Sequence, residues 1–466
     1  MRLALVLACL TLLAAPAATA TAPFTQWCGG SGESAADRTD TQQAFQIHVV
    51  YAVPAGGTDR FAQVVSGIAT DLASIDVWWR NQDGTRTPRF DLAAFSPCSS
   101  TFGQLDISAV HLLHDAAYYA PKQYELLRDD LDAAGFNDPD KKYLVYYDGP
   151  AVQSSADTVT CGSADSGVTG GGPFAYSIAY LGGFCGATLG TGGPTAVIAE
   201  HELIHGLGAL AIPPVPPGPP HACPGDPGHP CDSPKDILSP SFDPDVTLDS
   251  LVLDVGRDDY YGHPGPWWDI RNSLFLAHLD SSDTTAPTTP AGFTATSRGP
   301  QVVLGWRASR DEVGPVAYRV YRDGLFVART TATRFIDNDA EEGRTYTYAV
   351  RAYDGANYVS GKPQLHFRVG FGIVDDTGRL VRDTVPPPPV GPIHARATHT
   401  SIVLAWRPVT DPGGLRGYRI QRNGALYATV IQPTVEIPAA RARAHWTIRA
   451  VDRAGNLGAA ARIIVR

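Results

Sequence analysis

His201, Glu202 and His205 are the residues whose types and spacing could do chemistry in this chain. Residues four apart lie on one face of a helix, so the imidazoles of His201 and His205 can bind one metal ion together. A zinc ion held by neutral nitrogens keeps a position open for water and lowers the pKa of that water to about 7. Glu202 can take a proton from the water and return it to a leaving group. The spacing therefore predicts a zinc site with Glu202 as its general base.

The flanking residues favour a helix over residues 195–208. Gly193, Pro194 and Thr195 precede the pattern as the start of a helix would. Five apolar residues surround the polar ones: Val197, Ile198, Leu203, Ile204 and Leu207. Polar groups in so apolar a helix need a function, and metal binding supplies one.

Alternating strands and helices precede this helix. We expect strands at residues 45–53, 105–113 and 142–148 and helices at residues 59–80 and 124–131. Residues 174–181 are predicted to form an edge strand just before the metal-binding helix. An edge strand beside the site would offer unpaired backbone groups to an extended peptide.

Composition and charge indicate an exported protein of several domains. A chain of 466 residues is long for one core, and a net charge of −10 without a basic run argues against a nucleic-acid partner. Arg2, the apolar residues 3–10 and the sequence Ala-Thr-Ala at residues 18–20 predict a signal peptide at residues 1–22. No later run is apolar enough to span a bilayer. We expect a secreted, extracellular protein, and a monomer.

The cysteines predict three disulfide bonds. Apart from Cys9 in the signal segment, six cysteines remain, and this even number suits an oxidising compartment. Proximity in the sequence favours the pairs Cys28–Cys98, Cys161–Cys185 and Cys223–Cys231.

The sequence HELIHGLG at residues 201–208 resembles the HExxHxxG core of the metzincin-like zinc peptidases. In that family a third ligand, His or Asp, follows the glycine after two intervening residues, where this chain has Ala211. Residues 236–239 are similar to the family's methionine-containing turn beneath the metal, with Leu238 in place of methionine. The resemblance implies an α+β zincin/metzincin-like catalytic domain, in which a twisted mixed sheet accompanies the active-site helix.

The third metal ligand has several candidates. No glutamate occurs between Glu202 and Glu312, which excludes a glutamate ligand of the thermolysin type. The remaining donors are His229, His221, Asp232 and His263. His229 is favoured and His221 is next, because His229 lies in a disulfide-closed loop just before the turn at residues 236–239, the order that the family uses.

A calcium ion is also conceivable, although no EF-hand spacing supports it. The aspartates that could hold it are Asp226, Asp232, Asp243, Asp245, Asp258 and Asp259.

The C-terminal part of the chain contains an internal repeat. The sequence VLGW at residues 303–306 returns as VLAW at residues 403–406, and YRVYRDG at residues 318–324 returns as YRIQRNG at residues 418–424. Alternating apolar strands, Asp-Gly and Asn-Gly turns and one tryptophan per copy favour two all-β immunoglobulin-like sandwiches. They resemble fibronectin type III domains, with Trp306 and Trp406 in their cores.

Together these features predict a secreted zinc metalloendopeptidase that hydrolyses a protein or peptide substrate. The metalloprotease domain is expected at residues 23–283, and the fibronectin type III-like domains at 284–370 and 385–466, with a linker at 371–384 between them. The C-terminal domains could bind polysaccharide or a cell surface. The alternative is a catalytically inactive zincin-fold adhesion protein. A metal-dependent hydrolase of a non-peptide amide is a third interpretation, because the same residues allow it.

Overall fold

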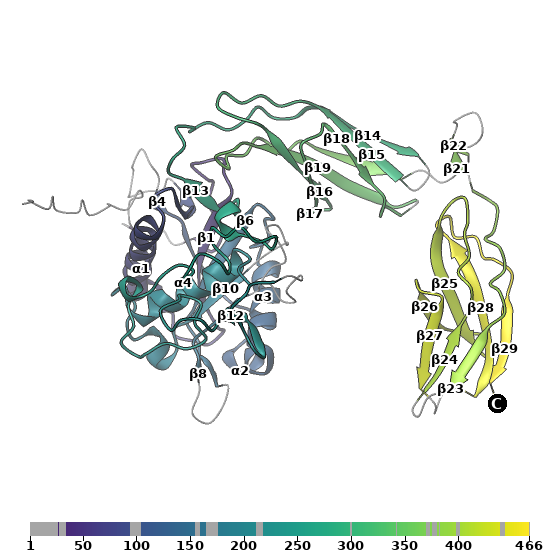
Figure 1. The fold of residues 1–466 in the computed structure, drawn as a ribbon, viewed down its shortest axis with the longest axis horizontal. Helices are drawn as coiled ribbons and strands as arrows, with labels where there is room; N and C mark the ends of the chain where they lie inside the picture. Colours follow the sequence, from purple (N-terminus) through teal and green to yellow (C-terminus); the bar gives the residue numbers. More distant parts are fainter. Residues whose placement is uncertain are drawn as a thin grey trace, which may run out of the picture. The chain divides into compact units, whose positions relative to one another are not determined.

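The chain forms two units in a computed structural model, Met1–Ser282 and Asp283–Arg466 (Figure 1). The structure describes residue 27 and residues 34–93, 104–153, 159–164, 176–210, 218–298, 301–341, 343–369, 373–374, 380–381, 383–397, 401–438 and 443–465. The predicted signal peptide, Cys28, Cys98 and Ala211 lie outside the described residues, as does most of the predicted linker.

A five-stranded mixed sheet forms the centre of the first unit. Its order is β5 (Ile107–His111), β1 (Gln46–Val53), β6 (Lys141–Tyr147), β10 (Tyr176–Tyr180) and β9 (Gly162–Ala164). The first four strands are parallel, and β9 runs antiparallel to β10. The prediction that residues 174–181 form an edge strand is therefore wrong. β10 is an inner strand, which explains why all five of its residues are buried, and β9 forms the edge.

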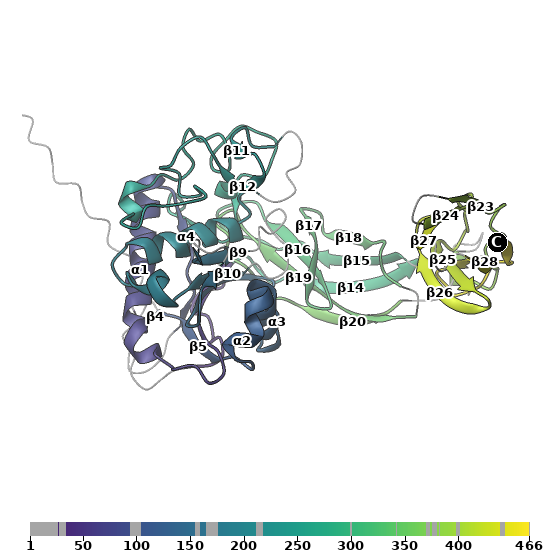
Figure 2. The same ribbon diagram turned by 90° about the horizontal axis from the view of Figure 1, so that it is seen from below.

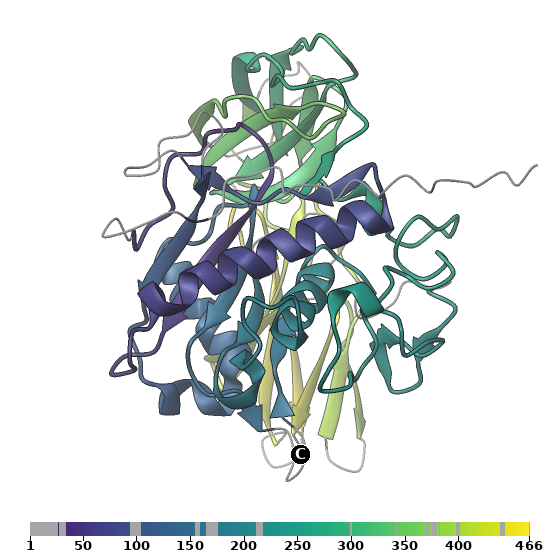
Figure 3. The same cartoon turned by 90° about the vertical axis from the view of Figure 1, so that its left-hand side faces the viewer.

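Helices cover both faces of this sheet (Figure 2). On one face α1 (Phe61–Gln82) contacts α4 (Pro194–Gly206), and Figure 3 shows α1 running across that face. On the other face, α2 (Ala116–Tyr119) and α3 (Gln123–Ala133) bury Tyr119, Leu127 and Leu131 against the sheet. Burial on both faces explains the nearly continuous apolar sequences of β1 and β6.

Short elements complete the first unit. The short strands are β2 (Arg86–Pro88), β3 (Leu92–Ala93), β4 (Gln104–Leu105), β7 (Val152–Gln153), β8 (Val159–Thr160), β11 (Ala222–Cys223), β12 (Asp226–Pro230) and β13 (Leu276–His278). The 3-10 helices are η1 (Ala120–Lys122), η2 (Gly183–Gly186), η3 (Leu248–Ser250) and η4 (Ile270–Asn272). No helix among the described residues is long and apolar enough to cross a bilayer.

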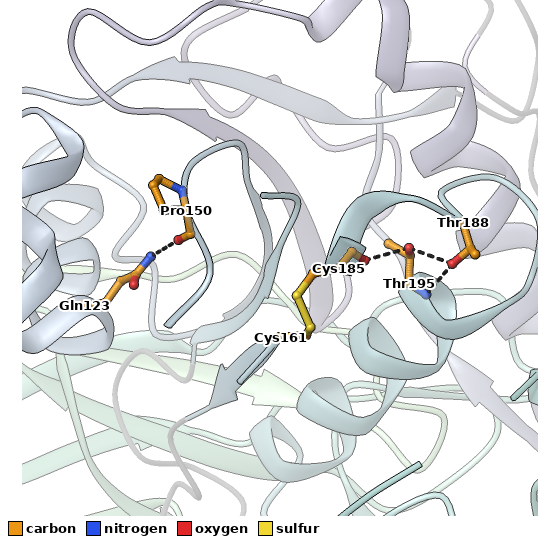
Figure 4. The surroundings of a disulfide bond; sticks show 6 residues. All are labelled: Gln123, Pro150, Cys161, Cys185, Thr188 and Thr195. Atoms are coloured by element: carbon orange, nitrogen blue, oxygen red, sulfur yellow. Dashed lines mark hydrogen bonds between the residues drawn. A yellow bond between two sulfur atoms is a disulfide. The ribbon is translucent and has the colours of Figure 1, made fainter. Parts of the chain in front are cut away.

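Two of the three predicted disulfides are present. Cys161 and Cys185 join the start of β9 to η2, just ahead of α4 (Figure 4). Thr195 anchors the same region, because its hydroxyl donates to the Cys185 carbonyl at 2.8 Å and its amide to the Thr188 hydroxyl at 3.0 Å. Cys223 and Cys231 close the loop that contains His229. The first bond therefore ties the start of β9 to the segment before α4, and the second closes the His229 loop on itself.

The second unit contains the two predicted β-sandwiches, which have fibronectin type III-like topology. The first packs the sheet β14 (Ala291–Arg298), β15 (Gln301–Arg307) and β18 (Arg334–Asp337) on the sheet β17 (Leu325–Thr330), β16 (Ala317–Arg322), β19 (Thr345–Tyr353) and β20 (Gln364–Arg368). The second packs β23 (His394–Ala397), β24 (Ser401–Ala405) and β27 (Thr434–Pro438) on β26 (Ala425–Val430), β25 (Leu415–Arg422), β28 (Ala444–Asp452) and β29 (Ala461–Val465). A hairpin of β21 (Ile373–Val374) and β22 (Leu380–Val381) lies between them in the sequence. Trp306 and Trp406 are buried in the two cores, as predicted.

Candidate functional site

Helix α4 brings His201, Glu202 and His205 into the interior of the first unit. The helix begins at Pro194 after Gly193, close to the predicted start, and ends at Gly206. Each of the three side chains is at most 8% exposed. The Ser177 hydroxyl of β10 donates to the Glu202 carbonyl oxygen at 2.8 Å, so the helix packs directly on the sheet.

Three imidazoles converge at this helix. The Nε2 atom of His201 lies 3.2 Å from Nε2 of His205 and 3.2 Å from Nε2 of His229. Two nitrogen ligands of a tetrahedral ion with bonds of about 2.0–2.1 Å would lie about 3.3 Å apart. The spacing of the three nitrogens therefore fits a shared divalent ion of the transition series.

The other ring nitrogens fix the tautomers of two of these histidines. Nδ1 of His201 lies 2.7 Å from the Ile237 carbonyl oxygen, which can only accept a hydrogen bond. Nδ1 of His229 lies 2.9 Å from the Asp226 carboxylate. The Nδ1 atom of each ring therefore carries the proton. The Nε2 atoms of His201 and His229 each present a lone pair to the other. Two facing lone pairs repel each other, and a cation between them removes that repulsion.

Burial also keeps the rings of His201 and His205 neutral. Burial, together with the charge of His229, lowers the pKa of His201 to about 3. Burial lowers the pKa of His205 well below its usual value, in the same direction as the charges of its two neighbours. Neutral imidazole is the form that binds metals.

A tight turn at residues 236–239 lies beneath the histidines. The Asp236 carboxylate accepts the Leu238 amide at 2.8 Å, and the Ser239 amide bonds to the Asp236 carbonyl oxygen at 3.0 Å. This geometry directs the Ile237 carbonyl oxygen at His201, and it leaves Leu238 fully buried. The turn thus sets the orientation of one candidate ligand.

Glu202 stands in an apolar environment next to the edge strand. Burial raises the pKa of its carboxyl to about 8. The backbone of Gly162 in β9 packs against it, so closely that a β-carbon there would come within 2.6 Å of Glu202 Cγ. The neighbouring Glu200 points elsewhere, because its Oε1 accepts the Trp79 indole N–H of α1 at 2.6 Å.

The other donors considered from the sequence lie apart from this cluster. His221 pairs with Asp259 at 3.1 Å, and His263 stacks on Trp267. Asp232 is exposed. The six aspartates considered for calcium do not meet: within the described residues Asp258 and Asp259 group with His221, and Asp226 binds His229.

Sequence reasoning missed three features of the site, namely the Ile237 carbonyl, Asp226 and Gly162. Asp226 had a weak signal, because it lies three residues before His229 in a disulfide-closed loop. The other two act through the backbone, which leaves no residue-type signature.

Several known proteins that are similar to part of the chain have the names of polysaccharide-degrading enzymes. The chain is 35% identical over 186 residues to exoglucanase B of Cellulomonas fimi, a match that covers 38% of this chain and 17% of that enzyme. It is 33% identical over 190 residues to chitinase A1 of Niallia circulans, covering 39% of this chain and 26% of that enzyme. The chain thus spans about a sixth to a quarter of the length of these relatives. The matched length is close to that of the second unit.

Comparisons of fold and family add little. No family model matches the chain. The central fibronectin-III array of RIM-binding protein is similar at 15% identity, covering 40% of this chain and 99% of that chain, with a TM-score of 0.16. That score is too low to establish a shared fold.

These comparisons correct the activity predicted from the sequence. The relatives are named exoglucanase, chitinase and endoglucanase, and none of these is a peptidase. The metzincin-like assignment, the zinc metalloendopeptidase activity, the zinc cofactor and the peptide substrate are therefore wrong. The relatives' names, which are those of enzymes, do not support the alternative of an inactive adhesion protein either. The five-residue motif misled because it sets the directions of two imidazoles on a helix but not the bond that is cleaved.

Proposed function

We propose that the first unit is a hydrolase that removes acyl groups, linked by an amide or ester bond, from a polysaccharide. In this proposal His201, His205 and His229 hold a divalent transition-metal ion, and Glu202 carries the proton. The assignment of the first unit to a zincin-type fold is part of the proposal, without peptidase activity. It is supported by the mixed sheet, whose antiparallel edge strand β9 contacts α4.

The convergence of three Nε2 atoms at 3.2 Å carries this proposal. Hydrogen bonds from Nδ1 of His201 and His229 aim two lone pairs at the same point, which is the arrangement that a cation needs. A divalent ion bound there would polarise an acyl carbonyl and lower the pKa of water.

The chain's own residues supply the proton chemistry. Glu202, kept from bulk solvent and with a raised pKa, takes a proton from water and returns it to the leaving amine or hydroxyl. The turn at residues 236–239 and Asp226 orient His201 and His229. Because Gly162 has no side chain, β9 can lie directly against the Glu202 side chain and restrict its movement.

The second unit supports the choice of a polysaccharide. The relatives whose matched segment is about as long as the second unit are named exoglucanase and chitinase. Chitin carries an N-acetyl amide on each sugar. A location outside the cell is part of the proposal. The two disulfides of the first unit and the signal-like N-terminal sequence support it.

Hydrolysis of a glycosidic bond is the second candidate, because the relatives' names favour it. That reaction uses two carboxyl groups on opposite sides of the bond. Of the two carboxylates that the proposal places at the histidine cluster, Asp226 is engaged by His229, which leaves Glu202 alone for proton transfer. The geometry therefore supports acyl transfer better than glycosidic cleavage.

Product analysis separates the two reactions. The purified chain is incubated with N-acetylated chitin oligomers and with O-acetylated xylan, and released acetate and new reducing ends are both measured. We expect acetate release without new reducing ends, abolished in Glu202→Gln and retained in the exposed control Glu125→Gln. New reducing ends without acetate would establish glycosidic cleavage and refute the proposal.

A further inference from the structure

Each β-sandwich of the second unit gathers three aspartates at one end. They are Asp283, Asp311 and Asp354 in the first sandwich and Asp383, Asp411 and Asp452 in the second. In each trio one carboxylate oxygen of every residue lies within 4.8 Å of the others. The two trios are related by the spacing of the internal repeat, which is 100 residues for the first two positions and 98 for the third. The arrangement therefore belongs to the module and is not a chance surface cluster.

Backbone amides hold the trio of the first sandwich in place. Asp283 precedes β14, Asp311 lies between β15 and β16, and Asp354 follows β19. Oδ1 of Asp283 accepts the amide of residue 285 at 3.1 Å, and Oδ1 of Asp311 accepts that of residue 313 at 3.0 Å. Oδ1 of Asp354 accepts the amides of residues 356 and 358 at 2.8 and 3.0 Å. One oxygen of each carboxylate is thus used for positioning.

The second carboxylate oxygen of Asp354 indicates that a ligand binds at this trio. Asp354 is 2% exposed, and its Oδ2 atom is buried without a hydrogen-bond partner. A buried carboxylate oxygen left in this state is destabilising, because it has lost its water partners without gaining others. Burial, with a smaller contribution from the charges of Asp283 and Asp311, raises the pKa of Asp354 to about 6. Each of these costs would be removed by a cation among the three carboxylates.

The second sandwich shows how the same position is satisfied without a cation. Oδ2 of Asp452 accepts the side-chain amide of Asn456 at 2.7 Å. The residue at the matching position of the first sandwich is Tyr358, which has no side-chain amide. The unpartnered oxygen is therefore specific to the first sandwich.

We propose that the first sandwich binds a calcium ion through Asp283, Asp311 and Asp354. Calcium takes six to eight oxygen ligands at about 2.3–2.6 Å in a flexible geometry, so carboxylate oxygens within 4.8 Å of one another can share one ion. Magnesium, with bonds of about 2.1 Å, requires a tighter octahedral set. The ion would join the segment that enters the sandwich to two loops at the same end. These residues are distinct from the six aspartates of the first unit considered for calcium above.

Calorimetric titration of the full chain with calcium, and separately with magnesium, tests the proposal. We expect Asp354→Asn to lose one calcium ion per chain relative to the parent, and the exposed control Asp339→Asn in the same sandwich to lose none. Equal calcium stoichiometry in the parent and Asp354→Asn would overturn the proposal, as would magnesium binding as tight as that of calcium.

A second variant keeps all three carboxylates. Tyr358→Asn supplies the first sandwich with the amide that Asn456 provides in the second. We expect its calcium affinity to fall about tenfold, because the amide competes for Asp354 Oδ2. Circular dichroism establishes that each variant is folded. An unchanged affinity in folded Tyr358→Asn would show that Oδ2 is not a ligand.

Discussion

The backbone of Gly162 lies directly against the side chain of Glu202. A β-carbon at residue 162 would approach Glu202 Cγ to 2.6 Å and Oε1 more closely still. Gly162 belongs to the edge strand β9 and Glu202 to α4, so strand and helix come together at the carboxylate. The missing side chain at residue 162 leaves the room that Glu202 occupies.

Gly162→Ala is expected to lower kcat by at least about tenfold while leaving the metal content unchanged. The new methyl group must displace either Glu202 or β9, and a misplacement of about 1 Å is enough to cost up to about 100-fold in rate. Steady-state acetate release and elemental analysis check the two parts. Gly314→Ala is the matched control, because a β-carbon there meets no atom within 4 Å. Full activity in Gly162→Ala would show that Glu202 does not need this position.

Removal of the Cys161–Cys185 disulfide should affect both stability and rate. A bond that closes 24 residues of sequence is worth about 3 kcal/mol, so the double serine variant should unfold at lower urea concentration. The bond also holds Cys161, which directly precedes Gly162 at the start of β9. Without it Gly162 can move away from Glu202, so kcat should fall while KM changes less. Urea unfolding followed by tryptophan fluorescence, together with kinetics at low urea, measures both effects. A loss of stability with unchanged kcat would limit the disulfide to a structural role.

Asp226→Asn is expected to weaken metal binding by about 10- to 100-fold, because Asp226 accepts the Nδ1 proton of His229 at 2.9 Å. An amide oxygen still accepts this proton but polarises the ring less. Competition with a coloured chelator measures the affinity. Asp243→Asn, an exposed aspartate outside the cluster, should bind metal like the parent. Equal affinities for both variants would contradict a role for Asp226.

A buried ion cluster gives the first unit a pH-dependent stability. The Lys141 ammonium contacts Asp37 at 2.6 Å, Asp40 at 2.7 Å and Asp91 at 2.6 Å. Burial alone would raise the pKa of Asp91, but the hydrogen bond from His48 and the charge of Lys141 outweigh it and lower that pKa. A lowered folded-state pKa contributes stability above the unfolded value of 3.8, and this stability is lost as the pH falls through the folded-state pKa.

Lys141→Met should therefore destabilise the first unit by up to about 3–5 kcal/mol at neutral pH, because it removes the cation that contacts the buried Asp91 and the partly exposed Asp37 and Asp40. The difference from the parent should shrink as the pH falls through and below the usual carboxyl value of 3.8, where Asp91 takes up a proton. Chemical unfolding at a series of pH values measures it. A difference that does not depend on pH would mean that Lys141 acts through packing alone. The exposed Lys122→Met serves as the control.

The parts of the fold set by local sequence were predictable. The positions of His201 and His205 follow from helical spacing alone, and α4 has nearly the predicted bounds. The turns at Asp323-Gly324 and Asn423-Gly424 adopt positive φ at both residues, as hairpins of this type require. Trp306 and Trp406 fall into cores because alternation along a strand determines which side chains face inward.

The parts set by long-range pairing were less predictable. The sequence placed residues 174–181 at a sheet edge, but β9 pairs beyond them through a segment of three residues too short to carry a pattern. The approach of His229 to α4 depends on a loop closed by Cys223–Cys231, and loop shape is not encoded by residue periodicity. The substrate class could not be deduced either, since His201, Glu202 and His205 are compatible with several bonds. The relatives' names pointed to polysaccharides, which the sequence had suggested only as a ligand of the C-terminal domains.

Elemental analysis of the purified chain tests the central claim most directly. We predict one divalent transition-metal ion per chain in the parent, retained in the surface control His394→Ala and largely lost in His229→Ala, whose fold is checked by circular dichroism. A parent that holds no such ion after exposure to divalent transition metals, or a His229→Ala variant that holds as much as the parent, would contradict the account.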